Sequence, residues 1–207
     1  GPHCPYDPTE QYLDGIDPDA MPPAAPPTED AEPLRIRNVN SNKRPWNGVD
    51  YGEFTHEQIK RVRAYYAAEV QQIDYEVGQI LEVLERKGLL DNTVIIFSAD
   101  HGDYLGDHGM IGKGTFYEAS IHVPMIVRVP GAAERANSSL VTLTDVMATI
   151  LAFAGLPTPD YVDSAAVYLD MAWDLEVDTL GYPAPKSDNG VAGSEVDCYL
   201  KEFGMGG

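Results

Sequence analysis

The 207-residue sequence has few basic residues, few cysteines and no long apolar run. Only 14 lysines and arginines stand against 33 acidic residues, and the net charge of -19 argues against binding to nucleic acid or to an anionic membrane. The two cysteines, Cys4 and Cys198, lie at opposite ends, so neither a zinc cluster nor a disulfide framework is indicated, and one long-range disulfide is left open. No apolar run approaches the roughly 20 residues of a membrane span.

The opening of the sequence indicates a piece of a longer protein. Residue 1 is Gly rather than Met, and a polar, proline-containing segment follows instead of a helix cap or a strand. We therefore expect truncation, which leaves the compartment open: the cytoplasm is favoured, and secretion or a periplasmic location stays in view because a leader would precede Gly1. No pattern indicates the oligomeric state.

Three segments differ in composition. Residues 1–50 are rich in proline and acidic residues, with two Pro-Pro pairs at 22–27, and predict a long surface loop without helix or strand. Residues 51–163 predict an α/β core. Residues 164–207 are acidic, carry no sustained period and predict an irregular tail, for which the sequence suggests no function.

The strongest structural signal is a long helix that begins after Thr55. The run Thr55-His56-Glu57-Gln58 fits a capping box. Apolar residues then recur at three- and four-residue steps until Gly88, which is a typical helix stop. The residues of this stripe are Ile59, Val62, Tyr66, Val70, Ile73, Val77, Ile80, Leu81 and Leu84.

Two strands and a second helix are predicted further along the chain. Residues 93–98 form a short β-branched run typical of a buried strand, and residues 123–129 predict another, with Pro124 near its start. Thr144-Asp145 predicts the cap of a final helix that runs through Ala154. A long helix that leads into a buried strand indicates an α/β fold.

The residues that can bind a ligand or take part in catalysis follow directly on the first predicted strand. In an open α/β sheet, ligands bind beyond the carboxyl ends of the strands. Asp100 and His101 can offer a carboxylate oxygen and an imidazole nitrogen to a divalent metal, and Lys113 can bind an anion at the same site as a point charge. The alternative for Asp100 and His101 is an ordinary strand-end turn. We expect Asp107 and His108 to shape the loop.

This region resembles the C-terminal conserved block of the type I sulfatase family, which belongs to the alkaline phosphatase superfamily. The resemblance covers roughly residues 1–12 and 50–163, and its pattern is nearest to choline-sulfatase-like and phosphonate-monoester-hydrolase-like members. It rests on Pro2-His3-Cys4-Pro5-Tyr6, Asn92-Thr93-Val94, Asp100-His101-Gly102, Leu105-Gly106-Asp107-His108-Gly109, Lys113-Gly114, Tyr117-Glu118, Val123-Pro124 and Pro130-Gly131.

The resemblance implies a fold, a reaction and a set of site residues. The implied fold is α/β, an alkaline-phosphatase-like sandwich with a mixed central sheet flanked by helices, present here only in part. The implied reaction is metal-dependent hydrolysis of a small-molecule sulfate ester. Asp100 and His101 would be ligands of one divalent ion, with Ca²⁺ favoured and Mg²⁺ or Mn²⁺ as alternatives. His3 and Lys113 would bind the oxygens of the transferred group and stabilise or protonate the leaving oxygen.

Two parts of the family pattern are absent from these 207 residues. The nucleophile, a formylglycine made within a Cys/Ser-x-Pro-x-Arg motif, has no counterpart, because neither Cys4 nor Cys198 stands in that motif. An Asp-Asp pair that completes the metal site is also missing. We therefore expect the formylglycine in an N-terminal part of the protein and no activity from this piece alone. A phosphate or phosphonate ester hydrolase and an inactive sulfatase-like chain are the alternatives.

Overall fold

The computed structural model describes residues 2–43, 50–137, 141–157 and 200–202. Contacts divide the chain into two compact units. The first unit comprises residues 1–92 and 102–115, and the second comprises residues 93–101 and 116–207. Among the described residues, no helix has the length and hydropathy that a membrane crossing requires.

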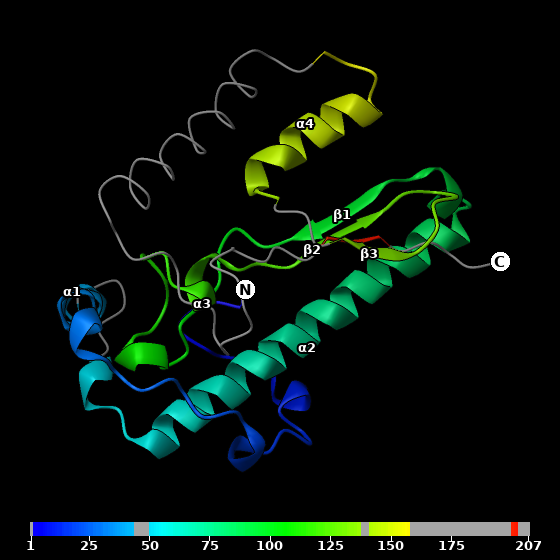
Figure 1. Cartoon of the computed structure of the whole chain (residues 1–207). Coiled ribbons are helices and arrows are strands. Elements are labelled where there is room, and N and C mark those ends of the chain that lie inside the picture. Colours follow the sequence, from blue (N-terminus) through cyan, green and yellow to red (C-terminus); the bar gives the residue numbers. More distant parts are fainter. Residues whose placement is uncertain (1, 44–49, 138–140, 158–199, 203–207) are drawn as a thin grey trace. The chain divides into compact units, whose positions relative to one another are not determined.

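The first unit is built around α2, a single helix over His56–Arg86 (Figure 1). The predicted capping box is present: the Gln58 amide donates to Thr55 Oγ1 at 3.3 Å, and the Thr55 amide donates to Gln58 Oε1 at 2.8 Å. At the other end Gly88 takes a left-handed φ of 65°, as predicted for the stop. The predicted apolar stripe is only partly covered, since Val70 and Ile80 are 44% and 61% exposed.

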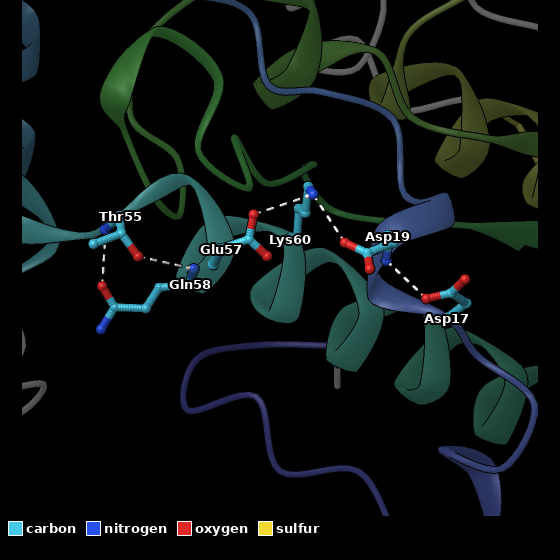
Figure 2. A network of polar contacts seen from close by, with 6 residues as sticks. All are labelled: Asp17, Asp19, Thr55, Glu57, Gln58 and Lys60. Atoms are coloured by element: carbon cyan, nitrogen blue, oxygen red, sulfur yellow. Dashed lines mark hydrogen bonds and ion pairs between the residues drawn. The ribbon is translucent and has the colours of Figure 1, made fainter.

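A network of polar contacts joins the first turns of α2 to the N-terminal segment. Figure 2 shows Lys60 reaching Asp19 of the short helix η2 (Pro18–Ala20) and Glu57 of its own helix, with Nζ–O distances of 2.9 and 3.2 Å. Asp17 caps η2 by accepting the Asp19 amide. Such exposed ion pairs contribute little to stability, so they align the segment more than they stabilise it.

The structure corrects the predicted loop at residues 1–50. This segment contains helix α1 (Glu32–Asn42) and the short 3-10 helices η1 (Glu10–Tyr12), η2 and η3 (Glu29–Ala31). Ala31 and Val39 are buried, and η4 (Tyr51–Glu53) follows with Tyr51 buried. The sequence did not predict helix α1, because a proline stands in its first turn and the helix carries no apolar stripe.

The loop after residue 102 folds back on itself within the first unit. The Tyr104 amide donates to the Gly112 carbonyl and the Gly106 amide to the Met110 carbonyl, both at 2.8 Å. Tyr104, Met110 and Ile111 are fully buried. Gly106 has a φ of 94°, and a Cβ there would stand 2.5 Å from the side chain of Ile59, so this glycine makes room for α2.

Arg63 of α2 clamps that loop to the proline-rich segment. Its guanidinium donates to the Leu105 carbonyl at 3.0 Å, the Pro22 carbonyl at 3.1 Å and Asp107 Oδ1 at 2.5 Å. The same Asp107 oxygen accepts the Ala25 amide at 2.7 Å. Asp107 is thus committed to holding the loop, as the sequence analysis expected.

The second unit contains a mixed four-stranded sheet in the order β1-β2-β4-β3. Strands β1 (Ile95–Ser98) and β2 (Met125–Arg128) are antiparallel, and both lie within the predicted strands. Strand β4 (Leu200–Glu202) pairs parallel with β2 and antiparallel with β3 (Arg135–Asn137). Arg128 donates from Nη1 to the Thr93 carbonyl at 3.2 Å, which ties the start of the first strand segment to the end of β2.

Two helices of the second unit lie between its strands in the sequence. Helix α3 (Glu118–Ile121) is a single turn before β2, and α4 (Leu143–Phe153) ends one residue before the predicted Ala154, which is its C-terminal cap. The cap of α4 is Thr142 rather than the predicted Thr144, because Thr142 and Asp145 form the capping box. Side chains of α4 and of β1 and β2 line a common cavity of about 200 Å³, so α4 lies over the sheet.

The predicted segment bounds at residues 50 and 163 stay predictions. The predicted irregular tail over 164–207 lies outside the described residues, apart from β4.

We predict that Arg63→Met lowers the free energy of unfolding by about 2 to 3 kcal/mol, because it removes the cation that pairs with the half-buried Asp107 carboxylate and leaves two carbonyls without the Arg63 donor. Urea unfolding of the chain measures this loss. The matched control is Arg61→Met, two positions away, where the side chain is exposed and has no hydrogen bond among the described residues. Equal losses in the two variants would show that Arg63 does not clamp the loop.

Candidate active site

His3 and Lys113, which stand 110 positions apart in the sequence, are brought together in the first unit. His3 Nε2 lies 3.0 Å from Lys113 Nζ. The other ring nitrogen, Nδ1, lies 2.6 Å from the Cys4 carbonyl oxygen. A carbonyl only accepts, so Nδ1 carries a hydrogen, and in the neutral ring Nε2 accepts from the Lys113 ammonium. Lys113 then keeps two N–H groups for another acceptor.

Three contacts hold the His3 segment in place. Cys4 Sγ lies 2.6 Å from the hydroxyl of the buried Tyr51. The Asp7 amide donates to Glu69 Oε1 on α2 at 3.0 Å, and the Tyr6 hydroxyl donates to Asp103 Oδ2 at 2.8 Å. The position of His3 is therefore set by the folded unit and not by local chain geometry.

Asp103 connects the loop of His3 with the loop of Lys113. Besides Tyr6, its carboxylate accepts the Leu105 amide at 3.0 Å and the Gly112 amide at 2.9 Å. Burial and the adjacent Asp103 raise the pKa of the Tyr6 hydroxyl, so Tyr6 stays a donor at any physiological pH. Sequence reasoning missed Asp103, because it overlooked that an Asp just before a glycine-rich loop often binds its own loop amides.

A cavity of about 320 Å³ opens beside the pair, a size at the lower end of small-molecule sites. Its cationic and neutral donors come from three separate segments of the first unit. The lining residues are His3, Cys4, Leu34, Arg37, Asn38, Ser41, Asn42, Asp103, Ile111, Gly112, Lys113, Gly114 and Thr115. Two of the four sequence-predicted site residues thus share one cavity wall.

Asp100 and His101 belong to the second unit, directly after β1. Asp100 Oδ2 lies 3.5 Å from His101 Nε2, and the Asp100 side chain is 87% exposed. A carboxylate oxygen and an imidazole nitrogen fit a divalent cation chemically. Among the residues that the structure describes, no group of three or more His, Cys, Asp or Glu side chains is arranged to hold a metal ion. A hard cation takes about six or more ligands, so this pair can supply only part of a shell.

Another histidine of the second unit also pairs with an acid. His122 Nδ1 lies 2.8 Å from Oε2 of Glu118, which is buried. The two residues span one turn of α3. His122 is therefore packed, in keeping with its position before a strand.

Glu69 is an unusual buried acid on α2. It is 9% exposed, and its Oε2 atom has no hydrogen-bond partner among the described residues. Burial raises the pKa of Glu69 above its ordinary value of 4.5. No sequence signal marked this residue, because position 69 lies within an otherwise regular helical pattern.

The fold is that of the alkaline-phosphatase-like hydrolases. The chain is similar to the solved structure of the phosphonate monoester hydrolase SpPMH from Silicibacter pomeroyi, with a TM-score of 0.63, 31% identity, and coverage of 78% of this chain and 34% of that one. This confirms the expected mixed α/β architecture, present here in part.

The sulfatase family model matches residues 1–156, and the chain belongs to the sulfatase family. It is 32% identical over 175 residues to an arylsulfatase of Clostridium perfringens, covering 80% of this chain and 34% of the relative. It is 40% identical over 109 residues to arylsulfatase K of Bos taurus, covering 52% and 20% respectively. The chain thus spans about a third or less of the length of these relatives.

We predict a specific pH dependence of stability from Glu69. The folded state holds the Glu69 proton more tightly than the unfolded state, so the free energy of unfolding falls as the pH rises above 4.5 and through the raised pKa. Glu69→Gln cannot ionise, and it keeps an oxygen for the Asp7 amide. The variant should therefore gain stability relative to the natural chain as the pH rises from 4.5 through the raised pKa of Glu69.

Urea unfolding at a series of pH values measures this difference. Glu76→Gln, at an exposed position of the same helix, is the control and should show no such trend. A difference between Glu69→Gln and the natural chain that does not change with pH would contradict the assignment.

Proposed function

We propose that the protein containing this chain hydrolyses sulfate esters, and that the chain supplies anion-binding and metal-binding residues but not the nucleophile. The observation that carries the proposal is the His3–Lys113 pair, 3.0 Å apart at the wall of a cavity. Two positions that match separate motifs of the family, 110 residues apart in the sequence, meet at one place. A chance resemblance in either motif would not produce this meeting.

The pair suits the charge changes of sulfuryl transfer. Negative charge shifts onto the leaving oxygen as the ester bond breaks, and fixed donors aimed at that charge lower the barrier. Lys113 donates to an oxygen of the transferred group through its remaining N–H groups. His3 is held by the Cys4 carbonyl and accepts from Lys113, so it orients the Lys113 ammonium, which can stabilise or protonate the leaving oxygen.

Asp100 and His101 are the proposed metal ligands of this chain. Carboxylate oxygens suit Ca²⁺, Mg²⁺ and Mn²⁺, and Ca²⁺ is favoured because the family resemblance implies it. When bound, the ion would act as a Lewis acid on the ester oxygens. The remaining ligands and the formylglycine nucleophile are proposed to come from a segment outside these 207 residues.

A phosphonate or phosphate ester is the second candidate substrate class. The similarity to a phosphonate monoester hydrolase at 31% identity favours it specifically. A tetrahedral phosphoryl centre presents similar anionic oxygens to Lys113 and His3. An inactive sulfatase-like protein is the remaining alternative.

The test begins with the complete reading frame. We predict that it encodes a Cys/Ser-x-Pro-x-Arg motif and an Asp-Asp pair upstream of Gly1, and that the encoded protein hydrolyses 4-nitrophenyl sulfate. Lys113→Ala and His3→Ala should each lower kcat by about a hundredfold or more, the usual loss for a transition-state donor. The control is Lys87→Ala, which removes an exposed lysine at the end of α2 and should leave kcat unchanged.

The outcomes separate the candidates. Faster turnover of 4-nitrophenyl phenylphosphonate than of the sulfate would transfer the assignment to phosphonate esters. Absence of the nucleophile motif from the whole reading frame would end the catalytic proposal.

A separate prediction concerns the metal. Asp100→Asn in the complete protein should weaken Ca²⁺ binding, measured by calorimetry, by more than about tenfold, because it removes a charged ligand. Asp74→Asn, at an exposed position of α2, should leave binding unchanged. Unchanged affinity in Asp100→Asn would exclude Asp100 as a ligand.

A further inference from the structure

One whole face of helix α1 lines the cavity beside His3 and Lys113. The lining positions follow the spacing i, i+3, i+4, i+7 and i+8, which places them on one side of a helix. They are Leu34, Arg37, Asn38, Ser41 and Asn42. Four of the five are polar, so this face is built to meet a polar ligand or water and not a hydrophobic core.

Asn38 fixes this face against the loop of Lys113. Its side-chain amide donates to the Ile111 carbonyl at 2.8 Å, and its oxygen accepts the Ile111 amide at 3.1 Å. Ile111 is buried and stands two residues before Lys113. These two hydrogen bonds therefore hold helix α1 against the loop of Lys113, so that both line the same cavity.

Arg37 is the cation of this face. It is exposed, and it makes no hydrogen bond or ion pair with any residue that the structure describes. The cavity also holds Lys113 and His3, whereas its single acid, Asp103, already accepts three hydrogen bonds from the protein. In a chain with 14 basic and 33 acidic residues, the presence of two cations, Arg37 and Lys113, at one cavity points to an anionic ligand.

We propose that α1 forms the subsite for the leaving group, and that Arg37 binds a second anionic group carried by that leaving group. The inference rests on the proposed function, in which His3 and Lys113 bind the transferred sulfate. Arg37 comes from a different wall and has a planar fork of donors that matches a carboxylate or a second sulfate. The substrate class is then a small sulfate ester with a further negative charge, rather than an uncharged aryl ester.

Two probes that differ at one group test the proposal on the 207-residue chain. Butyl sulfate and 3-carboxypropyl sulfate have the same length, and a terminal methyl in the first is a carboxylate in the second. Calorimetric titration should show about tenfold tighter binding of the carboxylate probe, as expected for a charge-assisted pair. Arg37→Met should abolish this preference, and Arg37→Lys should retain part of it.

Arg61→Met is the matched control, since it removes an exposed arginine of the same unit outside the cavity and should keep the preference. Circular dichroism checks that each variant is folded. If Arg37→Met does not fold, Arg37→Lys is used to test whether the preference for the carboxylate probe falls. Equal binding of the two probes by the natural chain would overturn the proposal. An equal loss for both probes in Arg37→Met would also overturn it, because Arg37 would then bind the sulfate itself.

Lys113→Ala distinguishes this failure from failure of the proposed function. If it leaves butyl sulfate affinity unchanged, the sulfate does not bind at Lys113 and the proposed anion site is wrong, and the subsite inference falls with it. If Lys113→Ala weakens both probes while the natural chain shows no preference between them, only the subsite inference fails.

Discussion

The candidate anion site depends on the carboxylate of Asp103. One of its oxygens accepts two amides of its own loop, and the other accepts the hydroxyl of Tyr6, 97 positions away. The first set of bonds shapes the loop that carries Lys113, and the second holds the segment that carries His3. A carboxylate with three donors has most of its charge satisfied inside the protein. It can therefore stand near cationic groups without being their main partner.

The site must attract an anion within a strongly acidic chain. At long range the net charge of -19 repels anionic ligands, but salt screens this repulsion over about 8 Å at physiological ionic strength. Within the cavity, the donors of Arg37 and Lys113 act at contact distance, and His3 orients Lys113 by accepting from it. Short-range hydrogen bonding therefore decides binding, and the acidic surface chiefly lowers the encounter rate.

Periodic elements were predictable from the sequence, and α1 was not. Helix α2 follows a regular apolar stripe between a capping box and Gly88, and β1 and β2 lie within β-branched runs. Helix α1 turns a polar face toward a cavity, so it has no apolar period to detect. The sequence predicted Thr144 as the cap of α4, because either threonine suits a cap. The observed cap is Thr142, because only Thr142 has Asp145 at the third helical position.

The sequence by itself determined the family and the identity of the proposed site residues His3, Asp100, His101 and Lys113, because motifs are linear patterns of residue types. The tertiary structure alone decided that His3 meets Lys113, that Asp103 joins their loops and that Asn38 brings α1 to the same cavity. These contacts link residues 110, 97 and 73 positions apart. They depend on distances and donor directions in the folded chain, which no local pattern encodes.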